Sequence, residues 1–79
     1  MLREKIILSN LDLKILEFVK EEKFIFNIIK EFDMNYPSIK RHIDRLKKIK
    51  TINITSFGNF NKIKINRLGI NLLEILNEK

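Results

Sequence analysis

The chain has 79 residues, of which 44% are hydrophobic and 33% charged, and its formal net charge at pH 7 is +6. This length predicts a single domain, residues 1–79, whose small core makes oligomerisation a common way to gain buried surface. Because the chain has no cysteine and one histidine, His42, disulfides, thiolate metal sites and multi-histidine metal sites are excluded.

The first expected helix begins near Ser9 or Asn10. Ser9, with Asp12 three residues later, resembles a capping box, in which each side chain bonds the backbone N–H of the other residue. The segment before the helix, residues 5–8, is open to two interpretations: a short extension of the domain, or an arm that packs on a partner chain. The apolar residues that follow at helical spacing are Leu11, Ile15, Phe18 and Val19.

Two more helices are expected over residues 25–32 and 36–48. Asp33 tolerates the left-handed backbone that a tight helix exit requires. Asn35 is a favourable N-cap for the next helix, and Pro37 is favourable in its first turn. The helix over 36–48 has a core side and a mostly cationic side. The core side consists of Ile39, Ile43 and Leu46, and the cationic side of Arg41, Arg45 and Lys48.

The hydrophobic period then changes to two over residues 51–55 and 62–65, which predicts a β-hairpin. Gly58 and Asn59 fit a two-residue type II′ turn, which takes glycine in its first central position. This turn sets three cross-strand pairs: Phe57 with Phe60, Ile54 with Ile63, and Ile52 with Ile65. All four isoleucines then lie on one face of the hairpin. The other face takes Asn53, Thr55, Lys62 and Lys64.

The last helix is expected to begin near Asn66, another N-cap candidate. Its apolar residues cover well over half of its circumference, which is typical of a helix with two apolar partners. One partner is the core of the chain, and the other is expected to be the same helix of a second subunit. Residues 67–79 are therefore predicted to be a dimerisation element. The candidate interface residues are Leu68, Leu72, Leu73, Ile75 and Leu76.

The excess positive charge lies in one stretch, residues 34–67. This stretch contains nine Lys and Arg residues and one acid, Asp44, so its net charge is +8, whereas the residues on either side each sum to −1. Such an asymmetry favours a polyanionic partner. A solvated basic face without a partner would give the same pattern.

The order helix, helix, helix, hairpin, helix predicts an α+β fold that is mainly α with a small β-hairpin. Within it, residues 28–46 resemble the helix-turn-helix of winged-helix regulators of the MarR and ArsR type. Residues 38–43 resemble the start of a recognition helix, and residues 65–69 resemble the passage from the wing into the final helix. The resemblance covers residues 11–76, and it departs from the family at Asp33, where glycine is usual. The matching core positions are Ile28, Phe32, Met34, Ile39, Ile43 and Leu46.

This resemblance implies sequence-specific binding of double-stranded DNA by a homodimeric transcription regulator. The helix over 36–48 would enter the major groove, and Arg41 is the best candidate for reading a base, because guanidinium pairs bidentately with guanine. Its later cations would contact phosphates, and the hairpin lysines would approach the minor groove or the backbone. The candidate DNA-binding residues are Asn35, Tyr36, Ser38, Lys40, Arg41, Arg45, Lys47, Lys48, Lys62 and Lys64.

Five residues also have structural interpretations. His42 is expected to be a boundary histidine with one hydrogen bond, and Asp44 to form an ion pair within its own helix rather than to contact cytosine. Tyr36 either contacts DNA or covers the start of its helix. Phe57 and Phe60 are expected to be buried against the body of the protein or a partner chain, with a contact to DNA or to another protein as the alternative.

The sequence offers no nucleophile with a base and orienter and no phosphate-binding loop, so we expect no enzymatic activity and no cofactor. No small-molecule effector is indicated. The apolar runs are far shorter than the roughly 20 residues that a bilayer requires, and there is no signal-peptide pattern, so we expect a cytoplasmic protein without a membrane partner, associated with the nucleoid when bound. Two alternative functions remain: a winged-helix module that binds other proteins, and an architectural protein that binds DNA regardless of sequence.

Overall fold

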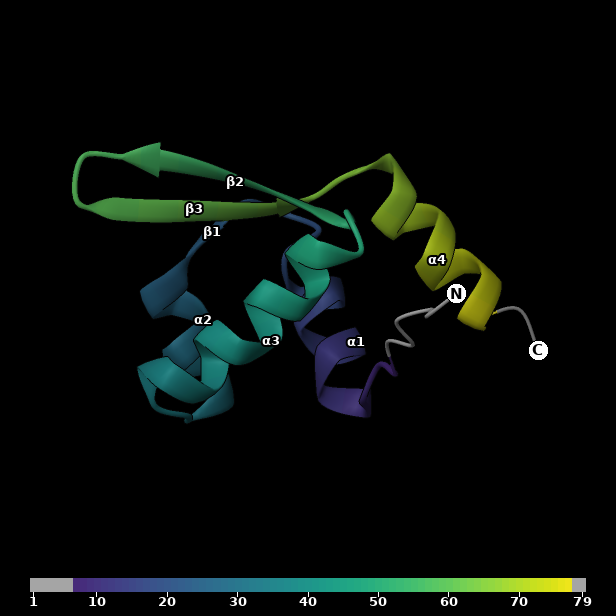
Figure 1. Ribbon diagram of the computed structural model, residues 1–79, viewed down its shortest axis with the longest axis horizontal. Coiled ribbons are helices and arrows are strands. Elements are labelled where there is room, and N and C mark those ends of the chain that lie inside the picture. The colour runs from purple at the N-terminus through teal and green to yellow at the C-terminus, as the bar shows by residue number, and fades with distance from the viewer. Residues whose placement is uncertain (1–6, 78–79) are drawn as a thin grey trace, which may run out of the picture.

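The computed structural model describes residues 7–77, which form four helices and a three-stranded antiparallel sheet (Figure 1). The fold is therefore α+β, as the sequence predicts. Residues 1–6 and 78–79 lie outside the described part, and with them most of the 5–8 segment and the last residues of the expected dimerisation element. Within residues 7–77 no helix has the length and apolar content needed to cross a membrane.

The first helix, α1 (Asn10–Phe18), begins at the predicted capping box. The Ser9 hydroxyl accepts from the Asp12 N–H at 3.1 Å, and the Asp12 carboxylate accepts from the Ser9 N–H at 2.8 Å. Two backbone donors that the helix itself leaves unpaired are thereby satisfied. This local bonding fixes the direction in which the Asp12 side chain leaves the helix.

A short strand that the sequence pattern does not predict, β1 (Lys23–Phe24), leads directly into α2 (Ile25–Phe32). The predicted order of elements is wrong at this point, because a two-residue strand is too short to show an alternating pattern. The α2 helix has the predicted bounds. It ends at Asp33, whose φ of 51° lies in the left-handed region expected for this exit.

The third helix, α3 (Tyr36–Lys48), also has the predicted bounds. The Asn35 side-chain oxygen accepts from the Ser38 N–H at 3.0 Å, which confirms Asn35 as the N-cap. Pro37 lies in the first turn, where its missing N–H leaves no hydrogen bond unmade. The sequence around residue 35 thus ends one helix and starts the next within three residues.

The predicted hairpin consists of β2 (Ile52–Phe57) and β3 (Phe60–Ile65). Its register is confirmed at all three expected pairs, from Ile52 with Ile65 to Phe57 with Phe60. Gly58 has a φ of 64°, and Asn59 is not among the described residues with positive φ, as expected for a type II′ and not a type I′ turn. The added strand β1 pairs with β3, so the order in the sheet is β1-β3-β2.

The fully buried core consists of aliphatic side chains, and Phe18 and Phe32 pack against its edge. Three helices, α1 to α3, lie on one side of the sheet and contribute most of it, together with the isoleucine face of the hairpin (Figure 1). None of the six phenylalanines is fully buried among the described residues. The buried hydrophobic residues are Ile15, Leu16, Val19, Ile28, Ile39, Ile43, Leu46, Ile52, Ile63, Ile65 and Leu73.

The last helix, α4 (Arg67–Asn77), lies at the end of the molecule opposite the hairpin turn (Figure 1). The Asn66 side-chain oxygen accepts from the Gly69 N–H at 3.0 Å, so Asn66 caps the helix as predicted. Gly69 is needed for the close approach of this helix to the sheet, because a Cβ there would collide with the Thr51 carbonyl oxygen and the Ile65 side chain. The passage from β3 into α4 is therefore tightly constrained.

Candidate nucleic-acid interface

One side of the N-terminal half of α3 is open to solvent. Tyr36, Lys40 and Arg41 are exposed, and Asn35 and Ser38 complete the same end of the helix through their capping hydrogen bond. The Arg41 guanidinium has no hydrogen-bond or ion-pair partner among residues 7–77. The first turn of α3 and the hairpin turn both lie at the end of the molecule away from α4 (Figure 1). The structure thus brings together the predicted residues of this helix end.

Asp44 is an acid on this cationic surface and reduces its net positive charge. The Lys40 ammonium lies 3.2 Å from the Asp44 carboxylate one turn along α3, which confirms the expected ion pair within the helix. Both side chains are about half exposed, so the pair adds little stability. Lys47 and Lys48 extend the exposed cationic side toward the end of the helix.

A groove of about 280 Å³ separates α3 from the hairpin. Its floor is formed by isoleucines from α2, α3 and both hairpin strands, and Lys40 and Lys47 stand along its α3 side. The hairpin side is polar but uncharged. The lining residues are Ile25, Lys40, Ile43, Asp44, Lys47, Ile54, Ser56, Asn61 and Ile63. Lys40 and Lys47, together with Asp44, thus border the groove between α3 and the hairpin, the two elements that the resemblance assigns to DNA.

Arg45, expected to contact phosphate, has a second role inside the protein. Its Nη1 donates to the Asp12 carboxylate of α1 at 2.8 Å, and its side chain is only about one-third exposed. The surface with which α3 contacts its neighbours extends beyond the apolar residues Ile39, Ile43 and Leu46. Arg45 lies on this wider surface and therefore faces α1. Its assignment as a phosphate contact stays a prediction, but this bond already occupies part of the guanidinium.

Asp12 is the fully buried acid at the centre of this contact between α1 and α3. Its carboxylate accepts from the Ser9 N–H, from His42 Nδ1 at 2.6 Å and from Arg45. Burial by itself raises the pKa of Asp12, but these hydrogen bonds and the Arg45 charge outweigh it, so its pKa lies below the ordinary 3.8. His42 has the hydrogen bond that the sequence predicts. No sequence signal points to Asp12 as its partner, because the two lie 30 positions apart.

The two hairpin lysines predicted to contact DNA differ in their surroundings. Lys62 is held by its neighbours: its ammonium lies 4.9 Å from the Phe57 ring centroid, 5.2 Å from that of Phe24, and 3.8 Å from a Glu22 carboxylate oxygen. Lys64 is exposed and has no ion-pair partner among the described residues. Both project from the face of the sheet that points away from α3, since Ile63 and Ile65 of the same strand point toward it.

The expectation that the body of the protein buries Phe57 and Phe60 is wrong. The two side chains are 60% and 54% exposed. Phe60 does contact other rings, since its centroid lies 5.9 Å from that of Phe24 and 6.0 Å from that of Phe26, both edge to face. The hairpin turn projects beyond the helices (Figure 1), and both rings remain more than half exposed.

The predicted dimer residues of α4 fall into two groups. Leu73 is only 5% exposed and lies in the core, and Leu72 packs partly against that core. Leu68, Ile75 and Leu76 are exposed, with Ile75 at 66%. These three side chains form an exposed apolar stripe on α4, and their assignment to a dimer interface stays a prediction.

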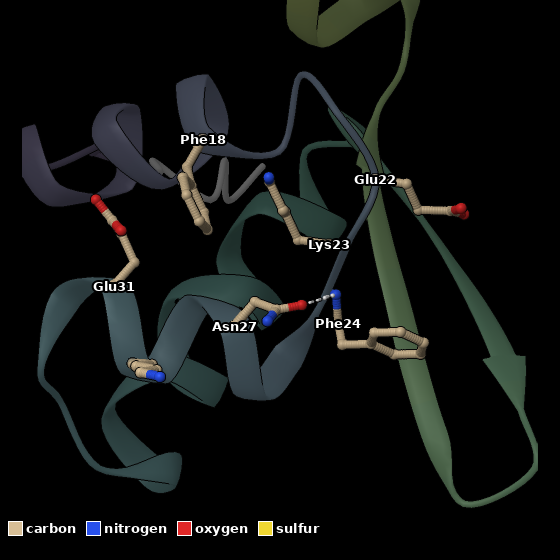
Figure 2. Close-up of a pocket in the computed structure, with 7 residues that line it drawn as sticks. Phe18, Glu22, Lys23, Phe24, Asn27 and Glu31 are labelled. Atoms are coloured by element: carbon tan, nitrogen blue, oxygen red, sulfur yellow. Dashed lines mark hydrogen bonds between the residues drawn. The ribbon is translucent and has the colours of Figure 1, made fainter.

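A second hollow, of about 610 Å³, lies on another side of the molecule (Figure 2). Its walls come from the end of α1, from β1 and from α2, and they mix acids, lysines and aromatic rings. Figure 2 shows the Lys23 ammonium beside Phe18, at 4.8 Å from the ring centroid, and the bond of 3.1 Å from the Phe24 N–H to Asn27. The hollow contains none of the predicted site residues. Its lining residues are Phe18, Glu22, Lys23, Phe24, Asn27, Lys30 and Glu31.

Residues 7–77 hold no group of three or more His, Asp or Glu side chains arranged to bind a metal ion. Comparisons of the chain with protein-family models, with curated proteins and with solved structures gave no match.

Proposed function

We propose that the chain is a winged helix-turn-helix protein that binds double-stranded DNA, with α3 in the major groove and the hairpin as the wing. The observation that carries the proposal is the solvent-exposed cationic side of α3, which begins at the first turn of the helix and lies beside the projecting hairpin. The major groove of B-DNA is wide enough for an α-helix, whose N-terminal residues then reach the base edges. The fold is compatible with this arrangement.

Arg41 is the residue proposed to read a base. It is exposed, it lies in the second turn of α3, and no described residue competes for its guanidinium. A guanidinium can donate two parallel hydrogen bonds to guanine O6 and N7. Lys40 is less available, because Asp44 holds its ammonium in the unbound protein.

Phosphate contacts are proposed for the remaining exposed cations. Lys47 and Lys48 lie farther along α3, and Lys64 lies on the hairpin. Such contacts supply affinity and its salt dependence without sequence information. Lys47, Lys48 and Arg41 would contact a duplex seated on α3, whereas Lys64 projects from the hairpin face that points away from α3. Arg45 is a weaker candidate than the sequence suggests, because it is bonded to Asp12.

We further propose a homodimer formed through α4, acting as a transcription regulator. The support is the stripe of Leu68, Ile75 and Leu76 that the single chain leaves exposed, at the end of the molecule opposite the hairpin turn. A symmetric pair would present two α3 helices to two half-sites, which are expected one helical turn apart, roughly 34 Å.

The test is a gel-shift titration with random duplex DNA and with the upstream region of the protein's own gene, at about 50 and 200 mM salt. Salt-sensitive binding that prefers the upstream region would support an autoregulating transcription factor. Salt-sensitive binding without preference would support the architectural alternative, or a regulator whose site lies elsewhere. An absence of binding at low salt would overturn the proposal and favour the module that binds other proteins.

A further inference from the structure

Four of the six phenylalanines gather in one surface cluster, which we call the aromatic face: Phe24, Phe26, Phe57 and Phe60. The Phe24 and Phe26 rings are stacked at a centroid distance of 5.1 Å and an interplanar angle of 8°. The Phe60 ring meets both of them edge to face, at 71° and 73°. The cluster joins β1, the first turn of α2 and the end of the hairpin, which are distant in sequence.

The aromatic face lies on the side of the sheet that points away from α3. Phe24 pairs with Lys62, and Phe57 pairs with Phe60, so the pleat directs these residues to the same face, opposite the buried Ile63. Figure 2 shows the Phe24 ring pointing toward the hairpin strands. This surface is therefore separate from the cationic side of α3.

The cluster is not an extension of the core. The fully buried hydrophobic residues are all isoleucine, leucine or valine, whereas Phe26, Phe57 and Phe60 are about half exposed or more. Burying aromatic rings stabilises a small protein more than burying most other side chains, since each carries a large apolar area. A chain that keeps these rings at its surface presents them to something outside itself.

A lysine sits inside the cluster. The Lys62 ammonium lies within cation–π range of two rings, those of Phe24 and Phe57, and Lys64 follows on the same face of the strand. Lysine is depleted from the centres of protein–protein interfaces, where aromatic residues are enriched. Aromatic rings interleaved with ammonium groups are instead typical of surfaces that bind unpaired nucleic-acid strands. The rings stack on the bases, each of which has a π face, and the ammonium groups bind the phosphates of the backbone.

We propose that the aromatic face binds single-stranded DNA, with bases stacked on Phe57 and Phe26 and phosphates on Lys62 and Lys64. A duplex does not suit this surface, because its bases are already stacked on one another and offer only their edges. Thr55, exposed on the same face and paired with Lys62 in the register, adds a hydroxyl for a base edge. The binding of an unpaired strand by stacking is independent of the proposed function. Only the choice of DNA over RNA as that strand rests on the proposed function.

The experiment uses the full chain and fluorescein-labelled oligothymidylate of about 20 nucleotides, longer than the roughly 4–16 nucleotides that one small single-strand-binding fold covers. Binding is measured by anisotropy, with oligouridylate and a labelled duplex in parallel. The key variant is Phe57→Leu, which keeps an apolar side chain but removes the ring. We expect the dissociation constant for the single strand to rise roughly 5- to 150-fold, with unchanged circular dichroism, because Phe57 is exposed.

Three further variants sharpen the test. The chain has no tryptophan, so Phe57→Trp introduces a single reporter whose emission a stacked base would quench. Lys64→Gln should lower the slope of log affinity against log salt by about 0.7 for a single strand. Lys14→Gln removes the same charge from an exposed position on α1 and should leave this slope unchanged.

The outcomes separate this proposal from the proposed function. Loss of single-strand binding in Phe57→Leu, with duplex binding retained, supports both. Single-strand binding that depends on Phe57 without any duplex binding supports the aromatic face and overturns the role of α3. A lack of single-strand binding at low salt, equal binding by Phe57→Leu, or a preference for oligouridylate overturns the proposal. So does a loss of self-association in Phe57→Leu, which would assign the aromatic face to a protein interface.

Discussion

The Arg45 guanidinium on α3 donates to the buried Asp12 carboxylate on α1, 33 positions earlier in the chain, at an Nη1–Oδ2 distance of 2.8 Å. Together with His42 at 2.6 Å, this bond ties the helix proposed to bind DNA to the first helix of the domain. Because Asp12 is fully buried and all its bonds are charge-assisted or short, the orientation of α3 depends on polar contacts as well as on the aliphatic core.

Replacement of Arg45 should therefore affect stability before it affects DNA binding. In Arg45→Met the apolar stem is kept and the charge lost, and we expect the free energy of unfolding to fall by about 1–3 kcal/mol. The loss is limited because Ser9 and His42 still bond the carboxylate. Urea unfolding measures it. If the variant is as stable as the wild type but binds duplex DNA more weakly, the structural role is contradicted and Arg45 is a phosphate contact.

Acid should weaken the contact at Asp12. Its pKa in the folded protein lies below 3.8, so its contribution to stability is present in full above that pH and is lost as the pH falls through the folded pKa. Urea unfolding of the wild type and of Asp12→Asn, from about pH 2 to 6, should show a difference in stability that shrinks toward acid. A difference that is constant over this range would contradict the assigned role of the Asp12 charge.

Replacement of Arg41 should weaken specific duplex binding by about 1–3 kcal/mol and relax the preference at one base pair. The reason is the loss of a bidentate contact to guanine from an exposed guanidinium. Anisotropy titrations of Arg41→Ala against the preferred site and a random duplex measure both effects. Arg67→Ala is the matched control, since Arg67 is also exposed but begins α4. An equal loss on every sequence would make Arg41 a phosphate contact.

Replacement of Ile75 should separate association from folding. Ile75 is exposed on α4, so Ile75→Glu should leave the fold intact and shift a dimer to a monomer in sedimentation equilibrium at tens of micromolar. Leu73→Ala is the contrasting variant, because Leu73 lies in the core, and its unfolding free energy should fall by about 2–5 kcal/mol. A wild type that is monomeric under these conditions would contradict the proposed dimer.

Gly69→Ala should destabilise the domain by about 1–3 kcal/mol, even though alanine is the better helix former. The added methyl group would collide with the Thr51 carbonyl oxygen and Ile65, so α4 would have to move away from the sheet. Thermal unfolding measures the loss. The neighbouring Ile70→Ala, at a more exposed site on the same helix, is the control and should change stability much less.

Most of the fold follows from local signals in the sequence. Ser9, Asn35 and Asn66 cap helices because each bonds a backbone N–H three residues ahead, a relation visible in the sequence itself. The hairpin register follows from the turn at Gly58 and from the period of two. The caps and the hairpin register depend on interactions between residues that are close in sequence, so a sequence pattern can predict them.

The parts that sequence reasoning missed all depend on distant residues. The strand β1 exists only because Lys23 and Phe24 pair with β3, nearly forty positions later. The Asp12 contact joins α1 to α3, so a helical wheel of α3 alone places Arg45 on the solvent side. The aromatic face likewise forms only when β1 and the hairpin end lie side by side, and its signal in the sequence is limited to two phenylalanines on an otherwise polar hairpin face.

The placement of the aromatic residues also determines which part of this protein its intrinsic ultraviolet fluorescence monitors. Tyr36 is the single tyrosine, the chain has no tryptophan, and Tyr36 is exposed in the first turn of α3. Native ultraviolet emission therefore comes from the helix end proposed to enter the major groove, and not from the core. A ligand seated on α3 would cover this side chain, which is 47% exposed in the unbound protein. The protein thus contains its own optical probe of the surface that matters most for its proposed function.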